Sequence, residues 1–87
     1  MYSKEKNFMK SLCTDYVQEL LDKVGWSDIQ KEMVTKKFLQ FKSICVICEE
    51  LNISDSTYTR YADNMYKKLQ TYLDKHKDTP ISKFYYL

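Results

Sequence analysis

Turn-forming residues are almost absent from this sequence. Its 87 residues include one Gly and one Pro, too few for the tight turns that join the strands of a small sheet protein. We therefore predict an all-α fold, in which a few helices are joined by short connections. A chain of this length makes a single domain over residues 1–87 with a modest core, which leaves little room for an enzyme cleft beside its scaffold.

Long apolar runs are also missing. No segment approaches the roughly 20 apolar residues that a membrane-spanning helix needs. The first residues lack the basic stretch followed by an apolar stretch that marks a secretory signal. We therefore expect a cytoplasmic protein with no membrane contact, and in such a reducing compartment its three cysteines should remain thiols.

The sequence contains no pattern typical of catalysis or of a cofactor site. It has one His, no Gly-rich phosphate loop and no nucleophile beside a His, so we expect a protein that is not an enzyme and needs no cofactor. Cys45 and Cys48 form a single Cys-x-x-Cys pair, and His76 is far from it. One such pair is a weak zinc signal, and we predict two buried thiols and no metal.

The charge balance is only weakly basic. The chain has 14 Lys and Arg residues and 12 Asp and Glu residues, which gives a net charge of +2. A DNA-binding protein with this balance would contact few phosphates and would lose affinity readily as salt rises. The eight tyrosines can fill a thin core while their hydroxyl groups still reach water or a phosphate.

The first 25 residues show a helical period. Ser3 can cap a helix that ends at Gly25, the residue type best suited to a positive φ after a helix. We predict one long helix over residues 1–25, with room for a bend at Thr14 and Asp15. The alternative is two short helices, because Thr14 and Asp15 both favour N-caps over helix interiors. The apolar positions of this pattern are Phe8, Met9, Leu12, Cys13, Tyr16, Val17, Leu20, Leu21 and Val24.

A second helix is predicted to start at Asp28. Ser27 and Gln30 have the spacing of a capping box, and Trp26 can pack on the first turn as a staple. The outward positions carry Lys31, Glu32, Lys36 and Lys37. The apolar face is predicted to consist of Ile29, Met33, Val34, Phe38, Leu39 and Phe41.

Two further helical patterns lie between residues 43 and 75, with only three residues between them. Ser43 can cap the first pattern and Asn52 can end it, since Asn tolerates a left-handed conformation. Ser54 can cap the second, and Ile53 should point inward as the plug of the turn. This arrangement predicts a helix-turn-helix, so that the whole chain is a small four-helix domain with a long last helix. The last helix buries a stripe formed by Tyr58, Ala62, Met65, Leu69 and Tyr72.

The residues from Ile47 to Ser54, followed after a two-residue spacer by Thr57-Tyr58-Thr59-Arg60, resemble a known family. They are similar to the fourth region of bacterial sigma factors, and more similar to phage late-transcription regulators of the autolysin-regulatory-protein type. The resemblance implies a phage or prophage transcription regulator that binds double-stranded promoter DNA, with RNA polymerase as a further partner.

On this hypothesis the helix that begins near Asp55 contacts DNA. The hydroxyl groups of Ser54 and Thr57 would hold phosphates, together with the first N–H groups of the helix. Arg60 could contact guanine and Asn64 could contact adenine. Lysines would supply positive charge along the DNA backbone. The complete predicted DNA-binding set is Ser54, Ser56, Thr57, Thr59, Arg60, Asp63, Asn64, Lys67, Lys68, Lys36, Lys37 and Lys42.

Two alternatives to promoter binding remain open from the sequence. The chain could be a protein-interaction module that docks on RNA polymerase or another phage or host protein. It could also be the DNA-recognition part of a small terminase subunit. The tail, residues 76–87, ends in the apolar cluster Phe84, Tyr85, Tyr86 and Leu87. We expect this cluster to pack on the first or the last long helix, either within one chain or across a homodimer.

Overall fold

The computed structural model describes residues 2–86, and within this range the chain is helical without strands. The predicted all-α class is confirmed. None of the described helices is long and apolar enough to cross a membrane. The elements are α1 (Ser3–Ser11), α2 (Thr14–Lys23), α3 (Asp28–Val34), the π-helical turn η1 (Thr35–Leu39), α4 (Ile44–Leu51), α5 (Asp55–Lys75) and α6 (Pro80–Tyr85).

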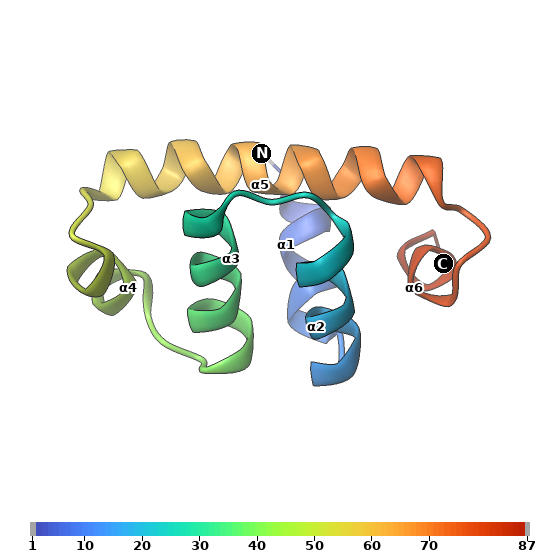
Figure 1. Ribbon diagram of the computed structural model, residues 1–87, viewed down its shortest axis with the longest axis horizontal. Helices are drawn as coiled ribbons and strands as arrows, with labels where there is room; N and C mark the ends of the chain where they lie inside the picture. The colour runs from blue at the N-terminus through green and yellow to red at the C-terminus, as the bar shows by residue number, and fades with distance from the viewer. Residues whose placement is uncertain (1, 87) are drawn as a thin grey trace.

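Helix α5 is the element on which α1, α3, α4 and α6 pack, while α2 contacts η1. It runs along the long axis of a molecule that measures 38 × 21 × 21 Å, and α2, α3, α4 and α6 all lie below it in Figure 1. The stripe predicted for this helix is confirmed, except that Tyr72 is only half-buried. Because the stripe faces one way, the opposite side of α5 remains uncovered. The buried residues of α5 are Tyr58, Ala62, Met65, Tyr66, Leu69 and Leu73.

Trp26 joins the link between α2 and α3 to α5. Its side chain is buried, and its indole Nε1 donates a hydrogen bond of 2.9 Å to the carbonyl oxygen of Met65. A buried indole N–H usually finds such an acceptor. Trp26 thus anchors this link on α5, a contact that the prediction of a staple on α3 did not include. The capping box of Ser27 and Gln30 is present as predicted.

The predicted single helix over residues 1–25 is wrong. α1 ends at Ser11, Leu12 is extended with ψ 145°, and α2 begins at Thr14 after an extended Cys13 that makes no side-chain cap. The alternative of two helices therefore holds. The chain reverses at the break, so that α1 runs away from α5 and α2 returns toward it (Figure 1). Because this segment forms two helices and the tail forms α6 (Pro80–Tyr85), the described chain has more helices than the four that were predicted.

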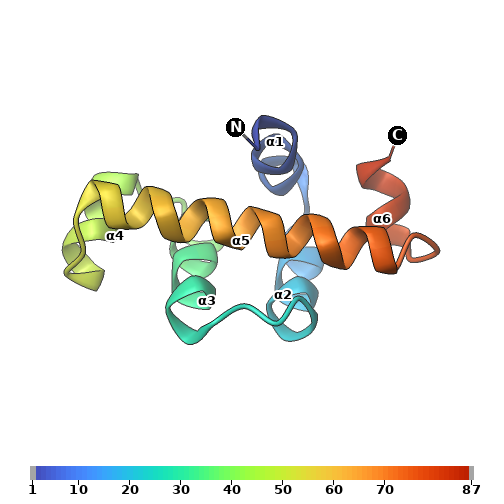
Figure 2. The same cartoon turned by 90° about the horizontal axis from the view of Figure 1, so that it is seen from above.

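Gly25 follows α2 with φ 80°, as predicted for a residue that ends a helix. The link that it starts runs alongside α5, on the side where α2 and α3 lie, as the view from above shows (Figure 2). Val24 and Gly25 consequently lie close to the C-terminal half of α5, where they line a groove with its polar side chains.

The tail is not loose. Thr79 caps α6 by accepting a hydrogen bond of 3.2 Å from the Ser82 amide, and Ile81 and Tyr85 are buried. The predicted packing of the tail on the first and long helices is confirmed in part within one chain, because α6 contacts α5 and the Phe8 ring of α1 lies 5.1 Å from that of Tyr85. Phe84 and Tyr86, two other members of the predicted apolar cluster, remain exposed. Leu87 lies outside the described residues.

The opposite ends of the chain also meet through a polar contact. The Tyr85 hydroxyl donates a hydrogen bond of 2.5 Å to the Glu5 carboxylate, which is only 5% exposed. The ammonium group of Lys4 lies 4.4 Å from the centre of the Tyr85 ring, a distance at which the cation is attracted to the ring face. We call the Glu5 and Tyr85 pair the terminal clasp.

Several residues are less buried than the sequence predicted. Cys13 and Tyr16 of the first helical pattern are exposed. Cys48 is buried but Cys45 is exposed, so only one of the two thiols lies in the core. Phe41 is 82% exposed and has φ 57°, because the chain turns out of the π-helical η1 at this residue. Ile53 is half-buried at the edge of the core, which makes it a partial plug of the turn.

Buried tyrosines make the fold sensitive to alkali. Burial raises the pKa of Tyr66. The pKa of Tyr85 is raised mainly by burial and also by the hydrogen bond to Glu5. Unfolded tyrosines lose their protons near pH 10, so the unfolded state binds fewer protons than the folded state above that pH. The free energy of unfolding should therefore fall as pH rises through about 10. Melting curves measured across this range would show it.

Tyr66→Phe removes one of these groups and should flatten the alkaline fall of the melting temperature. Tyr16→Phe is the matched control, because Tyr16 is exposed and should leave the pH profile unchanged. Identical profiles for the parent and Tyr66→Phe would contradict the assignment of Tyr66.

Candidate nucleic-acid interface

Helices α4 and α5 are joined by a short turn whose caps match the prediction. The Ser43 hydroxyl accepts a hydrogen bond of 3.3 Å from the Val46 amide at the start of α4. Asn52 ends α4 in the left-handed region with φ 56°. The Ser54 hydroxyl accepts a hydrogen bond of 3.1 Å from the Thr57 amide at the start of α5. These contacts fix a helix-turn-helix connection at the left end of the molecule in Figure 1.

The hydroxyl groups at the start of α5 bond mainly to one another. Ser54 Oγ donates to Thr57 Oγ1 at 2.9 Å and lies 3.1 Å from Ser56 Oγ. Asp55, the first residue of α5, adds a carboxylate at the same end. A negative charge there opposes phosphate binding, so this helix end is less suited to phosphate than Ser54 and Thr57 alone would indicate.

The uncovered side of α5 divides lengthwise into two edges of different charge. At about 100° per residue, positions three and four apart lie along the same edge. One edge contains no acidic residue, and we call it the basic edge. It consists of Thr57, Arg60, Asn64, Lys67, Lys68, Thr71 and Lys75.

Thr59 and Asp63, two of the predicted DNA contacts, lie on the opposite edge. The Thr59 hydroxyl donates a hydrogen bond of 3.0 Å to the Asp55 carbonyl of its own helix. Both residues line a cavity of about 370 Å³ between α1, η1, α4 and α5, together with Lys37. The structure therefore separates Thr59, Asp63 and Lys37 from the basic edge.

Lys36 and Lys42 share one acidic partner. Their ammonium groups lie 3.0 and 2.8 Å from the Glu50 carboxylate of α4. The hydrogen bonds from Lys42 and then from Lys36 lower the pKa of Glu50. Glu50 is thus ionised beside both cations. It offsets part of the positive charge that Lys36 and Lys42 were predicted to bring to the DNA backbone.

Gln30 is a residue of this interface that the sequence did not single out beyond its cap. Its buried side chain donates to Asn64 Oδ1 at 2.9 Å through Nε2 and accepts from Lys68 Nζ at 3.0 Å through Oε1. It thereby orients two side chains of the basic edge. Thr71 and Lys75 were also missed, although their spacing of seven and eleven residues from Asn64 places them on the same edge.

No family model, curated protein sequence or solved structure matches this chain.

Proposed function

We propose that this chain binds double-stranded DNA through the helix-turn-helix of α4 and α5, with the basic edge of α5 against the duplex. The observation that carries the proposal is the acid-free edge, which follows a capped three-residue turn and lies on a helix whose outer side is uncovered. A major groove admits such a helix. Most other elements lie on the far side of α5 (Figure 1), while α3 and the link before it border the basic edge at Asn64 and Lys68.

Within the basic edge, Arg60 and Asn64 have side chains that can contact base edges, and Lys67 and Lys68 have charges that can contact phosphates. The Arg60 guanidinium is exposed and lies 5.6 Å from the centre of the Tyr61 ring. Gln30 supports the position of Asn64. The resemblance of residues 47–60 to phage late-transcription regulators makes a promoter-binding regulator the specific form of this proposal, with RNA polymerase as a second partner.

A protein-interaction module is the second candidate, and one observation favours it. Phe41 is 82% exposed, and Ile44 and Val46 nearby are 40% and 39% exposed. Exposed apolar side chains of this kind are typical of protein contacts. They lie around the start of α4 rather than on the basic edge, so the two candidate functions use different surfaces.

Arg60→Ala should weaken binding to a selected DNA site by about 1 to 3 kcal/mol, the range for one bidentate base contact, and should relax the preference at one base pair. Fluorescence anisotropy with a site selected from genomic fragments would measure both effects. Lys83→Ala is the matched control, since it removes an exposed cation from α6.

The salt dependence separates the two candidate functions. About three phosphate contacts along the basic edge would give a slope of about −3 for the logarithm of affinity against the logarithm of salt. If Arg60→Ala binds the selected site as tightly as the parent, Arg60 does not contact a base. If no fragment binds at low salt, the DNA proposal fails and the surface around Phe41 becomes the leading candidate.

A further inference from the structure

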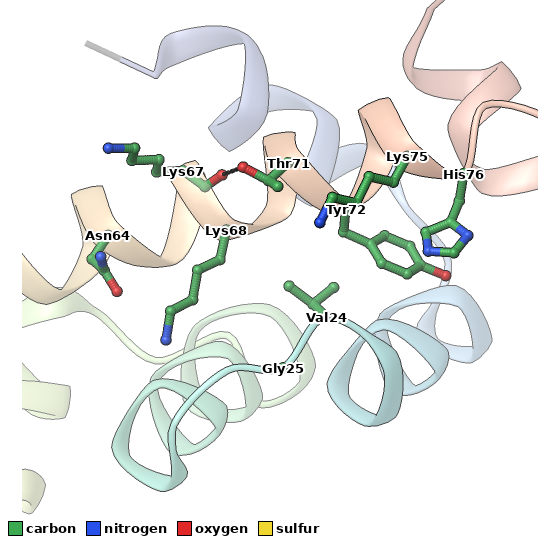
Figure 3. Close-up of a pocket in the computed structure, with 9 residues that line it drawn as sticks. All are labelled: Val24, Gly25, Asn64, Lys67, Lys68, Thr71, Tyr72, Lys75 and His76. Carbon is green, nitrogen blue, oxygen red and sulfur yellow. Dashed lines mark hydrogen bonds between the residues drawn. The ribbon is translucent and has the colours of Figure 1, made fainter.

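A groove of about 500 Å³ lies between α5 and the link from α2 to α3. Figure 3 shows that Val24 and Gly25 lie on one side of it, while Lys68 points across from α5 and Tyr72 and His76 lie together at the other end. The rings of Tyr72 and His76 are 4.5 Å apart, tilted by 35°. A volume of this size is ordinary for a small-ligand site.

The charge of this groove is of one sign. Lys67, Lys68 and Lys75 line it, and no acidic residue does. None of these three lysines makes an ion pair with any residue from 2 to 86, whereas Lys36 and Lys42 are both paired with Glu50. Cations gathered without counter-charges attract an anion, and a concave wall strengthens that attraction.

One of these cations is already positioned. The Gln30 side chain holds Lys68 in position, because Lys68 Nζ donates a hydrogen bond of 3.0 Å to Gln30 Oε1. Gln30 is itself fixed by the capping box of α3 and by its bond to Asn64. A pre-oriented ammonium group loses less conformational entropy when it binds than a freely rotating one.

We propose that this groove binds a phosphate group, with Lys68 and Lys75 as its main cationic partners. Lysine ammonium groups bind phosphate oxygens as point charges and do not need the planar geometry that arginine offers. The Tyr72 and His76 rings and Val24 give the groove an apolar wall beside these charges, which suits a phosphate carried on an organic compound such as a nucleotide.

The phosphate could belong to a small phosphorylated compound or to a nucleic-acid backbone. Lys75 lies 15 positions after Arg60, which is about 22 Å along the helix. The groove therefore extends well beyond the base contact proposed for Arg60, although it shares Asn64, Lys67 and Lys68 with the proposed DNA interface. Its occupation by a small phosphate compound does not depend on the proposed function.

The test uses four forms of the chain, the parent and three variants, and three probes. The groove variant is Lys68→Gln with Lys75→Gln, and the matched control, Lys31→Gln with Lys83→Gln, has the same net charge. Inorganic phosphate, adenosine monophosphate and a short DNA duplex are titrated at constant ionic strength while the amide signals of Gly25 and Thr71 are followed by NMR. Lys75→Gln alone is included because its side chain makes no hydrogen bond within the described chain, so its loss should leave the fold intact.

We expect saturable shifts at Gly25 and Thr71 in the parent and the control, and binding weaker by roughly tenfold or more in the groove variant. Saturation by phosphate or adenosine monophosphate would support the site with a small compound as its ligand. Saturation by the duplex alone would support it with the backbone as its ligand. The proposal would be overturned if the groove variant and Lys75→Gln bound every probe as tightly as the parent. It would also be overturned if sodium chloride produced the same shifts as the phosphate probes.

Discussion

Leu69→Ala should lower the free energy of unfolding by about 2 to 5 kcal/mol. Leu69 lies near the centre of the buried side of α5 and is 0% exposed. Its replacement leaves a cavity where the helices meet, and the surrounding side chains can collapse into it only in part. Chemical denaturation followed by circular dichroism would measure the change.

Gln70→Ala is the matched control, because Gln70 is the next residue of α5 and is exposed. It changes neither the core nor the helix propensity strongly, so its midpoint should stay close to that of the parent. Equal midpoints for Leu69→Ala and Gln70→Ala would show that α5 is not the centre of the core.

Tyr85→Phe should lower the free energy of unfolding by about 1.5 to 3 kcal/mol, because it removes the hydroxyl of the terminal clasp and leaves the Glu5 carboxylate without its partner. For a domain of this size the melting temperature would fall by about 4 to 8 °C per kcal/mol. Differential scanning calorimetry near pH 7 would give the value.

The cost comes from the unpaired charge, and a second replacement tests this. Glu5→Met together with Tyr85→Phe removes both polar partners and should recover most of the lost stability. Tyr86→Phe is the control: its hydroxyl bonds to Asp74 at the surface, so its loss should matter less. A double variant that is less stable than Tyr85→Phe would contradict this account of the clasp.

The features that the sequence predicted correctly depend on short stretches of chain. Ser27, Ser43 and Ser54 act as caps, and Gly25 and Asn52 adopt positive φ. Each depends on hydrogen bonds to residues three or four positions away or on the backbone freedom of one residue. Such interactions are encoded locally and can be recognised without knowledge of the tertiary packing.

The features that the sequence did not predict depend on distant contacts. The α1–α2 break falls within a continuous apolar period, so the cap preferences of Thr14 and Asp15 supported it only as an alternative. The reversed chain buries both Phe8 and Val17, which no local signal shows. Trp26 bonds to Met65, which is 39 positions away. No local pattern distinguishes that anchor from a staple on α3.

The candidate site was predicted in part. Spacing along α5 was sufficient to place Arg60, Asn64 and Lys67 on the exposed side of the helix, with Lys68 at its half-buried border. It could not show that Glu50 pairs with Lys36 and Lys42, because those partners come from separate elements.

The position of α5 has a consequence for how the chain opens. Helices α1, α3, α4 and α6 all contact α5, so none of them keeps its packing once α5 separates from the core. The central amide hydrogens of α5 should therefore exchange with solvent only when the whole chain unfolds. Since the clasp ties α6 to α1, their amides should become exchangeable together, and residues 80 positions apart would open as one cooperative unit.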